Sequence, residues 1–192
     1  HSFPTRRSSD LRHPAVVPLD QVGPNQFLLE LFHGPTLAFK DVAMQLISRL
    51  MDHVLAKRAQ RTTIVVATSG DTGGAAVEAF ANLDNVDLVV LFPNGRISEV
   101  QRRMMTTTGA ANVHALAISG TFDDAQARLK DLFNDHDFRD GVGLAGVNSI
   151  NWARLVAQAV YYVAAVLQLG GAERPVAFSV PTGNFGNAFA GF

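Results

Sequence analysis

The strongest constraint on the fold is the regular alternation of short apolar runs with longer stretches of helical periodicity. Residues 62–67 and 86–92 are rich in β-branched side chains and bounded by polar residues, as is typical of strands buried on both faces. The connections between such runs are too long for hairpins, so we expect right-handed crossovers between parallel strands. The sequence therefore predicts an α/β fold with parallel sheets and flanking helices. In such a fold, ligand sites lie at the carboxyl ends of the strands.

The same patterns place the individual elements. We expect strands at residues 27–31, 62–67, 86–92, 112–118 and 176–180. We expect helices at residues 40–59, from the loop at 68–74 to about 81, and at 97–107, 120–133 (with Thr121 as N-cap) and 152–167. The stretch 141–146 matches G-x-G-x-x-G, but it follows a predicted helix rather than a strand. It therefore does not indicate a dinucleotide site.

Composition argues against several classes of protein. The chain has 192 residues, of which 47% are hydrophobic and 17% charged, and its net charge of −1 comes without a basic run. That balance argues against a nucleic-acid-binding surface. The chain has no cysteine for disulfides or thiolate metal sites, and its six histidines show no metal-ligand spacing. No apolar run reaches membrane-spanning length, so we expect a cytoplasmic protein without a membrane, metal or nucleic-acid partner.

The two ends of the sequence do not match the rest. Residues 1–12 lack the apolar core of a signal peptide, and the stretch 3–11 resembles a cloning or sequence-assembly scar. We exclude residues 1–12 from the fold. The sequence stops at Phe192, where a new helix would be starting. We therefore expect a fragment of a longer protein.

Lys40 occupies an unusual position for a lysine. Stepping back along the apolar stripe of its helix, from Leu50 through Ile47 and Ala43, leads to Lys40 in the first turn. Both the positive end of the helix dipole and desolvation disfavour the protonated form there. Lys40 is thus a candidate nucleophile near neutral pH. The alternative is a structural lysine whose stem packs while its ammonium reaches water.

Two loops follow predicted strands and open helices, at residues 68–74 and 181–187. Backbone N–H groups and the helix dipole make such loops suitable for binding anions. In the second loop, Gly183 and Gly186 allow close approach to a ligand, and Asn184 and Asn187 supply amides. For the first loop, plain N-capping by Ser69, Asp71 or Thr72 is the alternative. Together with Lys40, the two loops indicate one shared anionic ligand.

Four motifs then occur in order along the chain. They are HGPTLAFKD at 33–41, SGDTG at 69–73, NSINWAR at 148–154 and GNFGN at 183–187. With these four motifs in this order, the chain resembles the threonine synthase family from about residue 15 to residue 192. The resemblance implies a fold-type-II (tryptophan synthase β-like) enzyme that uses pyridoxal 5'-phosphate (PLP). Such a lyase of threonine biosynthesis would convert O-phospho-L-homoserine and water to L-threonine and phosphate.

The resemblance also implies roles for residues. Lys40 would carry PLP as a Schiff base and, once released, serve as the catalytic base. The expected cofactor-binding residues are Lys40, Ser69, Asp71, Thr72, Gly183, Asn184, Phe185, Gly186 and Asn187. The expected substrate-binding residues are Ser69, Thr72, Asn148, Ser149 and Arg154, of which Asn148, Ser149 and Arg154 would hold the substrate phosphate.

The resemblance divides the chain into two parts. Residues 13–61 and 141–192 would belong to an incomplete PLP-binding domain, and residues 62–140 to a smaller α/β domain. Because family members are longer, we expect the fragment alone to be inactive. Two alternatives remain open. One is a related PLP-dependent dehydratase or β-replacement enzyme, and the other is a non-catalytic threonine synthase-like protein that binds phosphoesters.

Overall fold

The computed structural model describes residues 11–148 and 151–192. The strands are β1 (Leu19–Gly23), β2 (Gln26–Leu29), β3 (Thr62–Ala67), β4 (Val86–Pro93), β5 (Val113–Ile118) and β6 (Leu144–Ala145). The helices are α1 (Lys40–Arg58), α2 (Asp71–Phe80), α3 (Glu99–Thr106), α4 (Phe122–Asn134), α5 (His136–Gly141), α6 (Trp152–Gln168) and α7 (Gly186–Phe189), with a 3₁₀ turn at Gly171–Glu173. In these described residues no helix is both long and apolar enough to cross a membrane.

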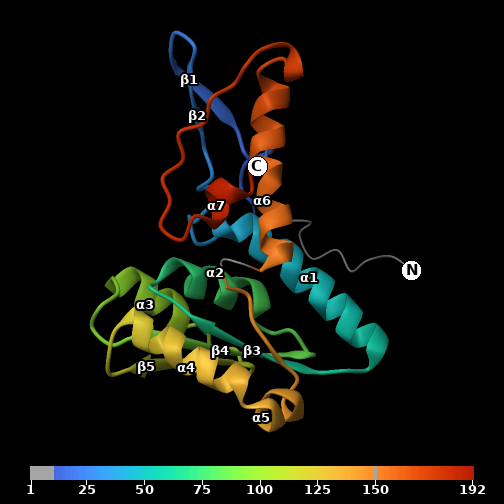
Figure 1. Cartoon of the computed structure of the whole chain (residues 1–192), viewed down its shortest axis with the longest axis vertical. Helices are drawn as coiled ribbons and strands as arrows, with labels where there is room; N and C mark the ends of the chain where they lie inside the picture. Colours follow the sequence, from blue (N-terminus) through green and yellow to red (C-terminus); the bar gives the residue numbers. More distant parts are fainter. Residues whose placement is uncertain (1–10, 149–150) are drawn as a thin grey trace.

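The larger sheet confirms the parallel α/β prediction. Its strands lie in the order β5-β4-β3-β6, and every neighbouring pair is parallel (Figure 1). The long strands β3, β4 and β5 lie within two residues of where the sequence predicts them. The two-residue strand β6 and the short helix α5 were not predicted, because neither is long enough to show a periodic pattern.

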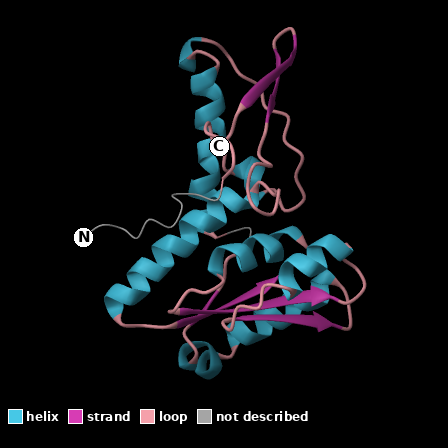
Figure 2. Cartoon of the chain, turned by 180° about the vertical axis from the view of Figure 1, so that it is seen from behind, coloured by secondary structure: helices cyan, strands magenta, loops and turns pink. Residues whose placement is uncertain are grey.

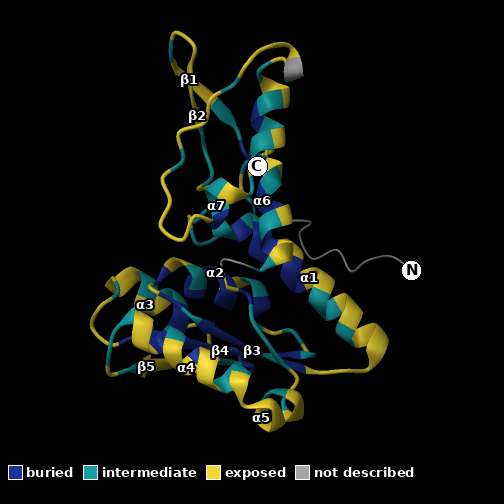
Figure 3. Ribbon diagram, in the orientation of Figure 1, coloured by how far each residue is buried: buried dark blue, intermediate teal, exposed yellow. Residues whose placement is uncertain are grey.

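Burial on both faces explains why β3 and β4 are continuous apolar runs. Ile64 and Val66 belong to a core cluster with residues of α1 and α2. Val65, between them in β3, belongs to a second cluster with Ala125 and Leu129 of α4. Since successive side chains of a strand point to opposite faces, α2 and α4 cover opposite faces of the sheet (Figure 3).

The expectation that no hairpin occurs is wrong for the first part of the chain. Strands β1 and β2 pair antiparallel, with Leu19 opposite Leu29. The sequence signal for this hairpin lies in the turn between the two strands, where Pro24 is followed by Asn25 with a φ of 56°. Figure 2 shows this hairpin standing apart from the larger sheet, beside α6.

The predicted strand at residues 176–180 is also wrong. This segment is in no strand, and its three central residues are exposed. A strand needs a neighbour to accept and donate its backbone hydrogen bonds, and the described part of the chain supplies none here. An apolar run alone therefore predicts the residues suited to a strand but not the presence of a partner.

The apolar stripes of α1 and α6 only partly match their buried faces. On α1, Ala43 and Ile47 are buried as expected, whereas Leu50 is 52% exposed. On α6, the exposed large apolar side chains are Trp152, Val156, Val160, Val163 and Leu167. The buried face of α6 instead carries Arg154, Gln158 and Tyr161 at positions i, i+4 and i+7. This polar face lies toward α1.

Asn112, just before β5, joins the end of α2, the turn that follows it and the start of β4. Its Nδ2 donates to the carbonyl oxygens of Phe80 at 2.9 Å and Val86 at 2.8 Å, and its Oδ1 accepts from the backbone N–H of Asn82 at 2.9 Å. The side chain is buried, so its loss would leave these backbone groups without partners. Such unpaired buried groups are costly.

We expect Asn112→Ala to lower the free energy of unfolding by about 2–4 kcal/mol, since several buried backbone groups lose their partner. Urea unfolding followed by far-UV circular dichroism measures this change. Exposed Asn134 provides a matched control, and Asn134→Ala should stay within about 0.5 kcal/mol of the parent. A loss for Asn112→Ala no larger than that of the control would contradict the assigned role.

Candidate active site

A cavity of about 350 Å³ lies where the first turns of α1 and α2 meet α6 and the loop that precedes α7. Its size is within the range of small-molecule sites. Its wall is formed by Phe39, Lys40, Ser69, Asp71, Thr72, Gln101, Arg154, Gln158, Pro181, Thr182, Gly183, Asn184, Gly186 and Asn187. Residues from five separate segments of the sequence therefore meet at one cavity.

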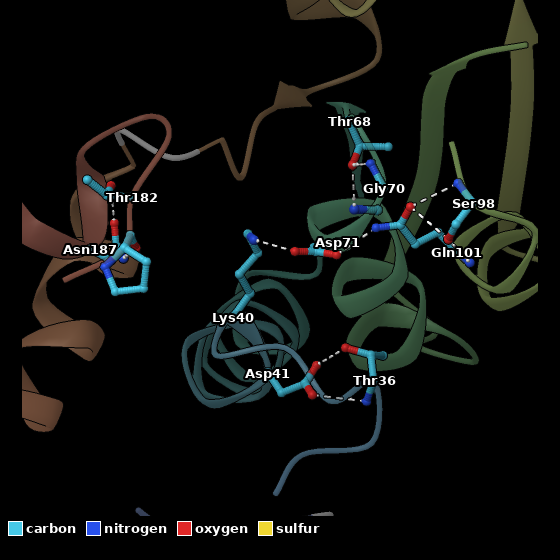
Figure 4. Close-up of polar contacts among 12 residues, drawn as sticks. Thr36, Lys40, Asp41, Thr68, Gly70, Asp71, Ser98, Gln101, Thr182 and Asn187 are labelled. Carbon is cyan, nitrogen blue, oxygen red and sulfur yellow. Dashed lines mark hydrogen bonds and ion pairs between the residues drawn. The ribbon is translucent and has the colours of Figure 1, made fainter. Parts of the chain in front are cut away.

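Lys40 is the first residue of α1 and is partly buried, with 16% of its side chain exposed. Its Nζ lies 3.1 Å from Asp71 Oδ2 (Figure 4). The same atom lies 4.4 Å from the centre of the Phe39 ring. The sequence predicts the position of Lys40 in the first turn but not its ion pair. Asp71 balances the charge that the helix dipole and partial burial disfavour.

The residues just before Lys40 are fixed by buried Asp41. Its carboxylate accepts hydrogen bonds from the backbone N–H of Thr36 at 2.9 Å and from Thr36 Oγ1 at 2.5 Å. A Cβ on Gly34 would lie 2.2 Å from Asp41 Oδ2, so only glycine fits there. Burial raises the pKa of Asp41, against the opposing effect of its hydrogen bonds. This small network sets where α1 begins.

The loop between β3 and α2 is fixed by Thr68. Its Oγ1 accepts from the backbone N–H groups of Gly70 and Gly73, each at 2.9 Å. Gly70 is the N-cap residue of α2 and makes no side-chain cap. The alternative that Ser69, Asp71 or Thr72 caps this helix is therefore wrong. Because buried Thr68 performs that task, these three side chains are available to line the cavity.

Asp71 is held by a second partner on its other oxygen. Gln101 Nε2 donates to Asp71 Oδ1 at 2.8 Å. Partial burial alone would raise the pKa of the Asp71 carboxyl, but the hydrogen bond from Gln101 and the charge of Lys40 outweigh it. The pKa of Asp71 therefore lies below its usual range, and the carboxylate is ionised at neutral pH.

Arg154 is a buried cation at the cavity wall. The residue is 2% exposed, and its Nη1 donates to the Val147 carbonyl oxygen at 2.9 Å. Its Nε has no hydrogen-bond partner, and within residues 11–148 and 151–192 no carboxylate pairs with it. Burial lowers the pKa of Arg154 to about 10, so it remains charged at neutral pH. A buried cation without a counter-ion is costly, and an anionic ligand would remove that cost.

The loop that precedes α7 is held by Asn187. The side chain accepts from Thr182 Oγ1 at 2.5 Å and donates to the Pro181 carbonyl oxygen at 3.0 Å. Tyr162 of α6 donates to the Asn187 carbonyl oxygen at 2.6 Å. A Cβ at Gly183 would meet nothing within 4 Å, so open space adjoins the loop at this residue.

The cavity brings together nine of the residues predicted from sequence. They are Lys40, Ser69, Asp71, Thr72, Arg154, Gly183, Asn184, Gly186 and Asn187. Asn148 and Phe185 are exposed and do not line it, and Ser149 lies outside the described residues. In the part of the chain that the structure describes, no group of three or more His, Asp or Glu side chains could hold a metal ion.

Sequence reasoning missed five wall residues, Phe39, Gln101, Gln158, Pro181 and Thr182. Gln101 could have been noticed as the fourth residue of an S-x-x-Q capping box, which the structure shows at the start of α3. Gln158 lies one turn after Arg154 on the same helix face, as a polar residue in a largely apolar helix. Its buried Oε1 also has no hydrogen-bond partner.

Comparison with known proteins identifies the family. A family model described as pyridoxal-phosphate dependent enzyme matches residues 12–192. The chain belongs to the pyridoxal-phosphate dependent enzyme family. This membership confirms the predicted fold class and the predicted cofactor, PLP.

Several similar proteins are threonine synthases. The enzyme of Pseudomonas aeruginosa is 59% identical over 180 residues, which cover 94% of this chain and 38% of that protein. A solved structure of PLP-bound threonine synthase from Brucella melitensis is 63% identical, with a TM-score of 0.87, over 95% of this chain and 39% of that one. Threonine synthase-like 2 of Xenopus laevis is 38% identical, over 94% of this chain and 39% of that protein. The chain thus spans about two fifths of the length of these relatives.

The cavity residues fit the cofactor of this family. Lys40 offers a primary amine, the group through which PLP is bound to proteins. The loop at 181–187 supplies neutral hydroxyl and amide groups and a glycine with open space beside it. Such groups suit a phosphate, and the cavity volume suits a small aromatic ring. These features of the cavity agree with the family assignment.

We expect Thr68→Val to lower the free energy of unfolding by about 1–3 kcal/mol, because the backbone N–H groups of Gly70 and Gly73 lose their acceptor. Urea unfolding measures the change. Thr68→Ser keeps the hydroxyl and should retain most of the stability. If Thr68→Ser were as destabilised as Thr68→Val, packing of the Thr68 methyl group rather than the hydroxyl would explain the loss.

Proposed function

We propose that this chain is the lysine-bearing part of a cytoplasmic threonine synthase, which converts O-phospho-L-homoserine and water to L-threonine and phosphate. The observation that carries the proposal is buried Arg154, a cation with an unpaired Nε at the wall of the cavity that also contains Lys40. A substrate phosphate would supply the missing negative charge. The identities to threonine synthases support the same reaction.

In this proposal the chain's own residues bind the ligand and move protons. Bound PLP acts as the electron sink for the reaction. Lys40 holds the cofactor covalently and, when released, carries a proton to and from the substrate. Ser69 and Thr72 bind the substrate carboxylate at the start of α2, and Gly183, Asn184, Gly186 and Asn187 hold the cofactor phosphate. Arg154 binds the substrate phosphate, with Asn148 and Ser149 as further candidates.

We propose a two-part organisation for the chain. Residues 13–61 and the segment after β6 would belong to a PLP-binding domain, and the sheet β5-β4-β3-β6 with its helices would form a smaller domain. Pairing of β6 with β3 supports a boundary after Ala145 rather than at residue 140. The site would then lie between the two domains, a common location for ligand sites.

The first test concerns cofactor attachment. We expect PLP followed by borohydride reduction to modify Lys40, because its amine alone among the three lysines lies at the cavity wall. Peptide mapping by mass spectrometry identifies the pyridoxyl-lysine peptide. Exposed Lys57 and Lys130 serve as internal controls, and Lys40→Ala should abolish the specific product. Modification of Lys57 or Lys130 with Lys40 unmodified would refute the assignment.

The second test concerns the substrate phosphate. In a protein that carries this segment at the length of its relatives, we expect Arg154→Ala to raise KM for O-phospho-L-homoserine while leaving PLP attachment intact. Loss of a buried charged hydrogen bond costs about 2–5 kcal/mol, which corresponds to a decrease in kcat/KM of roughly 30-fold or more. Arg128→Ala on the exposed face of α4 is the matched control. An unchanged kcat/KM for Arg154→Ala would show that Arg154 is structural.

A second candidate is a protein that binds PLP and a phosphoester without turnover. Similarity to threonine synthase-like 2 of Xenopus laevis favours keeping this candidate. The two tests above distinguish it, because attachment at Lys40 would persist while phosphate release from O-phospho-L-homoserine would be absent. Activity with serine or threonine in place of the phosphorylated substrate would instead support a dehydratase.

A further inference from the structure

Gln101 connects the first turn of α3 to the site through both ends of its side-chain amide. Its Nε2 donates to Asp71 Oδ1 at 2.8 Å. Its Oε1 accepts from the backbone N–H of Ser98 at 3.1 Å and from Ser98 Oγ at 3.0 Å. Since Asp71 Oδ2 pairs with Lys40 at 3.1 Å, a continuous series of contacts joins the start of α3 to Lys40 (Figure 4).

The partners of Gln101 fix which way its amide faces. The backbone N–H of Ser98 is only a donor, so the atom that faces it must be the amide oxygen. The NH₂ group therefore faces Asp71, and a carboxylate is a strong acceptor for it. Gln101 thus does two things at once: its oxygen completes the capping box of α3, and its nitrogen holds Asp71.

Gly70 provides the space in which the amide lies. A Cβ at Gly70 would meet the amide atoms of Gln101 at 2.3 to 2.5 Å, and the φ of Gly70 is 139°. A side chain at this position would therefore both strain the backbone and push the Gln101 amide away from Asp71. The loop of the SGDTG motif and the first turn of α3 are fitted to each other at this contact.

Few other charges face the pair formed by Lys40 and Asp71. Asp41 of α1 acts on Asp71 by electrostatic repulsion, but its own carboxylate is taken by Thr36. Arg154 of α6 lines the same cavity, where the loop at 181–187 contributes only neutral groups. Tyr161 of α6 donates its hydroxyl to the Phe39 carbonyl oxygen. Gln101 is the neutral residue whose hydrogen bond orients the Asp71 carboxylate.

We propose that Gln101 is a positioning residue that orients the Asp71 carboxylate toward Lys40 and so controls how freely the Lys40 amine can react. Without Gln101, the half-exposed Asp71 side chain could turn to solvent, and its ion pair with Lys40 would weaken. The inference rests on the proposed function only for its consequence, since a Lys40 amine held by Asp71 is less available as a nucleophile.

The test measures the reactivity of Lys40 directly, in protein without cofactor. Competitive acetylation at several pH values, read by mass spectrometry, gives the labelling rate of Lys40 relative to exposed Lys57 and Lys130. We expect Gln101→Ala to raise the relative rate of Lys40 at neutral pH by about two- to fivefold, the effect of weakening one partly exposed ion pair. Gln101→Met keeps the packing of the stem without the amide and should behave alike if Gln101→Ala fails to fold.

A double-mutant comparison separates positioning from general loosening. Asp71→Asn should raise the relative rate of Lys40 at least as much as Gln101→Ala, and adding Gln101→Ala to it should cause no further change. Ser98→Ala removes the hydroxyl cap of α3 but keeps the backbone N–H that orients Gln101, so the labelling of Lys40 should not change.

Three results would overturn the proposal. They are an unchanged Lys40 rate in both Gln101 variants, a further increase when Gln101→Ala is added to Asp71→Asn, or an equal increase in Ser98→Ala. None of these outcomes depends on whether PLP attaches to Lys40, which the borohydride experiment tests separately. The two proposals can therefore fail independently.

Discussion

The ion pair between Lys40 and Asp71 joins the first turns of two helices, and most of the polar contacts around the site serve to hold its two ends. The dipole of α1 disfavours an ammonium in its first turn, whereas the dipole of α2 favours a carboxylate in its own. The Asp71 carboxylate therefore compensates for the unfavourable position of the Lys40 ammonium, and the ion pair holds the starts of α1 and α2 together. Thr36 and Asp41 fix one start, and Thr68 fixes the other.

These contacts assemble the site from hydrogen bonds that are individually modest. A typical protein hydrogen bond contributes only about 0.5–1.5 kcal/mol, but an unpaired buried group costs more. Thr68 and Asp41 are both buried, so each must be satisfied by the loop that it orders. Arg154 and Gln158 are the exceptions. The Nε of Arg154 and the Oε1 of Gln158 are buried at the cavity wall without a hydrogen-bond partner, and of the two residues only Arg154 carries a charge.

The sequence predicts the larger sheet well because its central strands β3 and β4 are buried on both faces and the helices that flank it are amphipathic. It also predicts nine residues of the cavity wall, since their motifs lie at strand ends and helix starts, where a parallel sheet gathers ligand groups. It does not predict Gln158, and it does not predict Gln101, whose importance depends on a hydrogen bond to Asp71, 30 residues away in the sequence. The segment at 176–180 fails for a related reason. Whether an apolar run pairs as a strand depends on neighbours that its own residues do not specify.

The exposed and buried faces of α6 differ in a further respect. The apolar residues on its outer face tolerate exchange for one another, because only their size and polarity matter. Arg154, Gln158 and Tyr161 instead work as a set whose spacing of four and three residues keeps them on one side. Inserting one residue between them would rotate the remainder of the helix by about 100°. Either the Arg154 guanidinium would then face away from the cavity, or the Tyr161 hydroxyl would lose its contact with the Phe39 carbonyl oxygen. The outer face of this helix is thus constrained mainly in polarity, and the inner face in register.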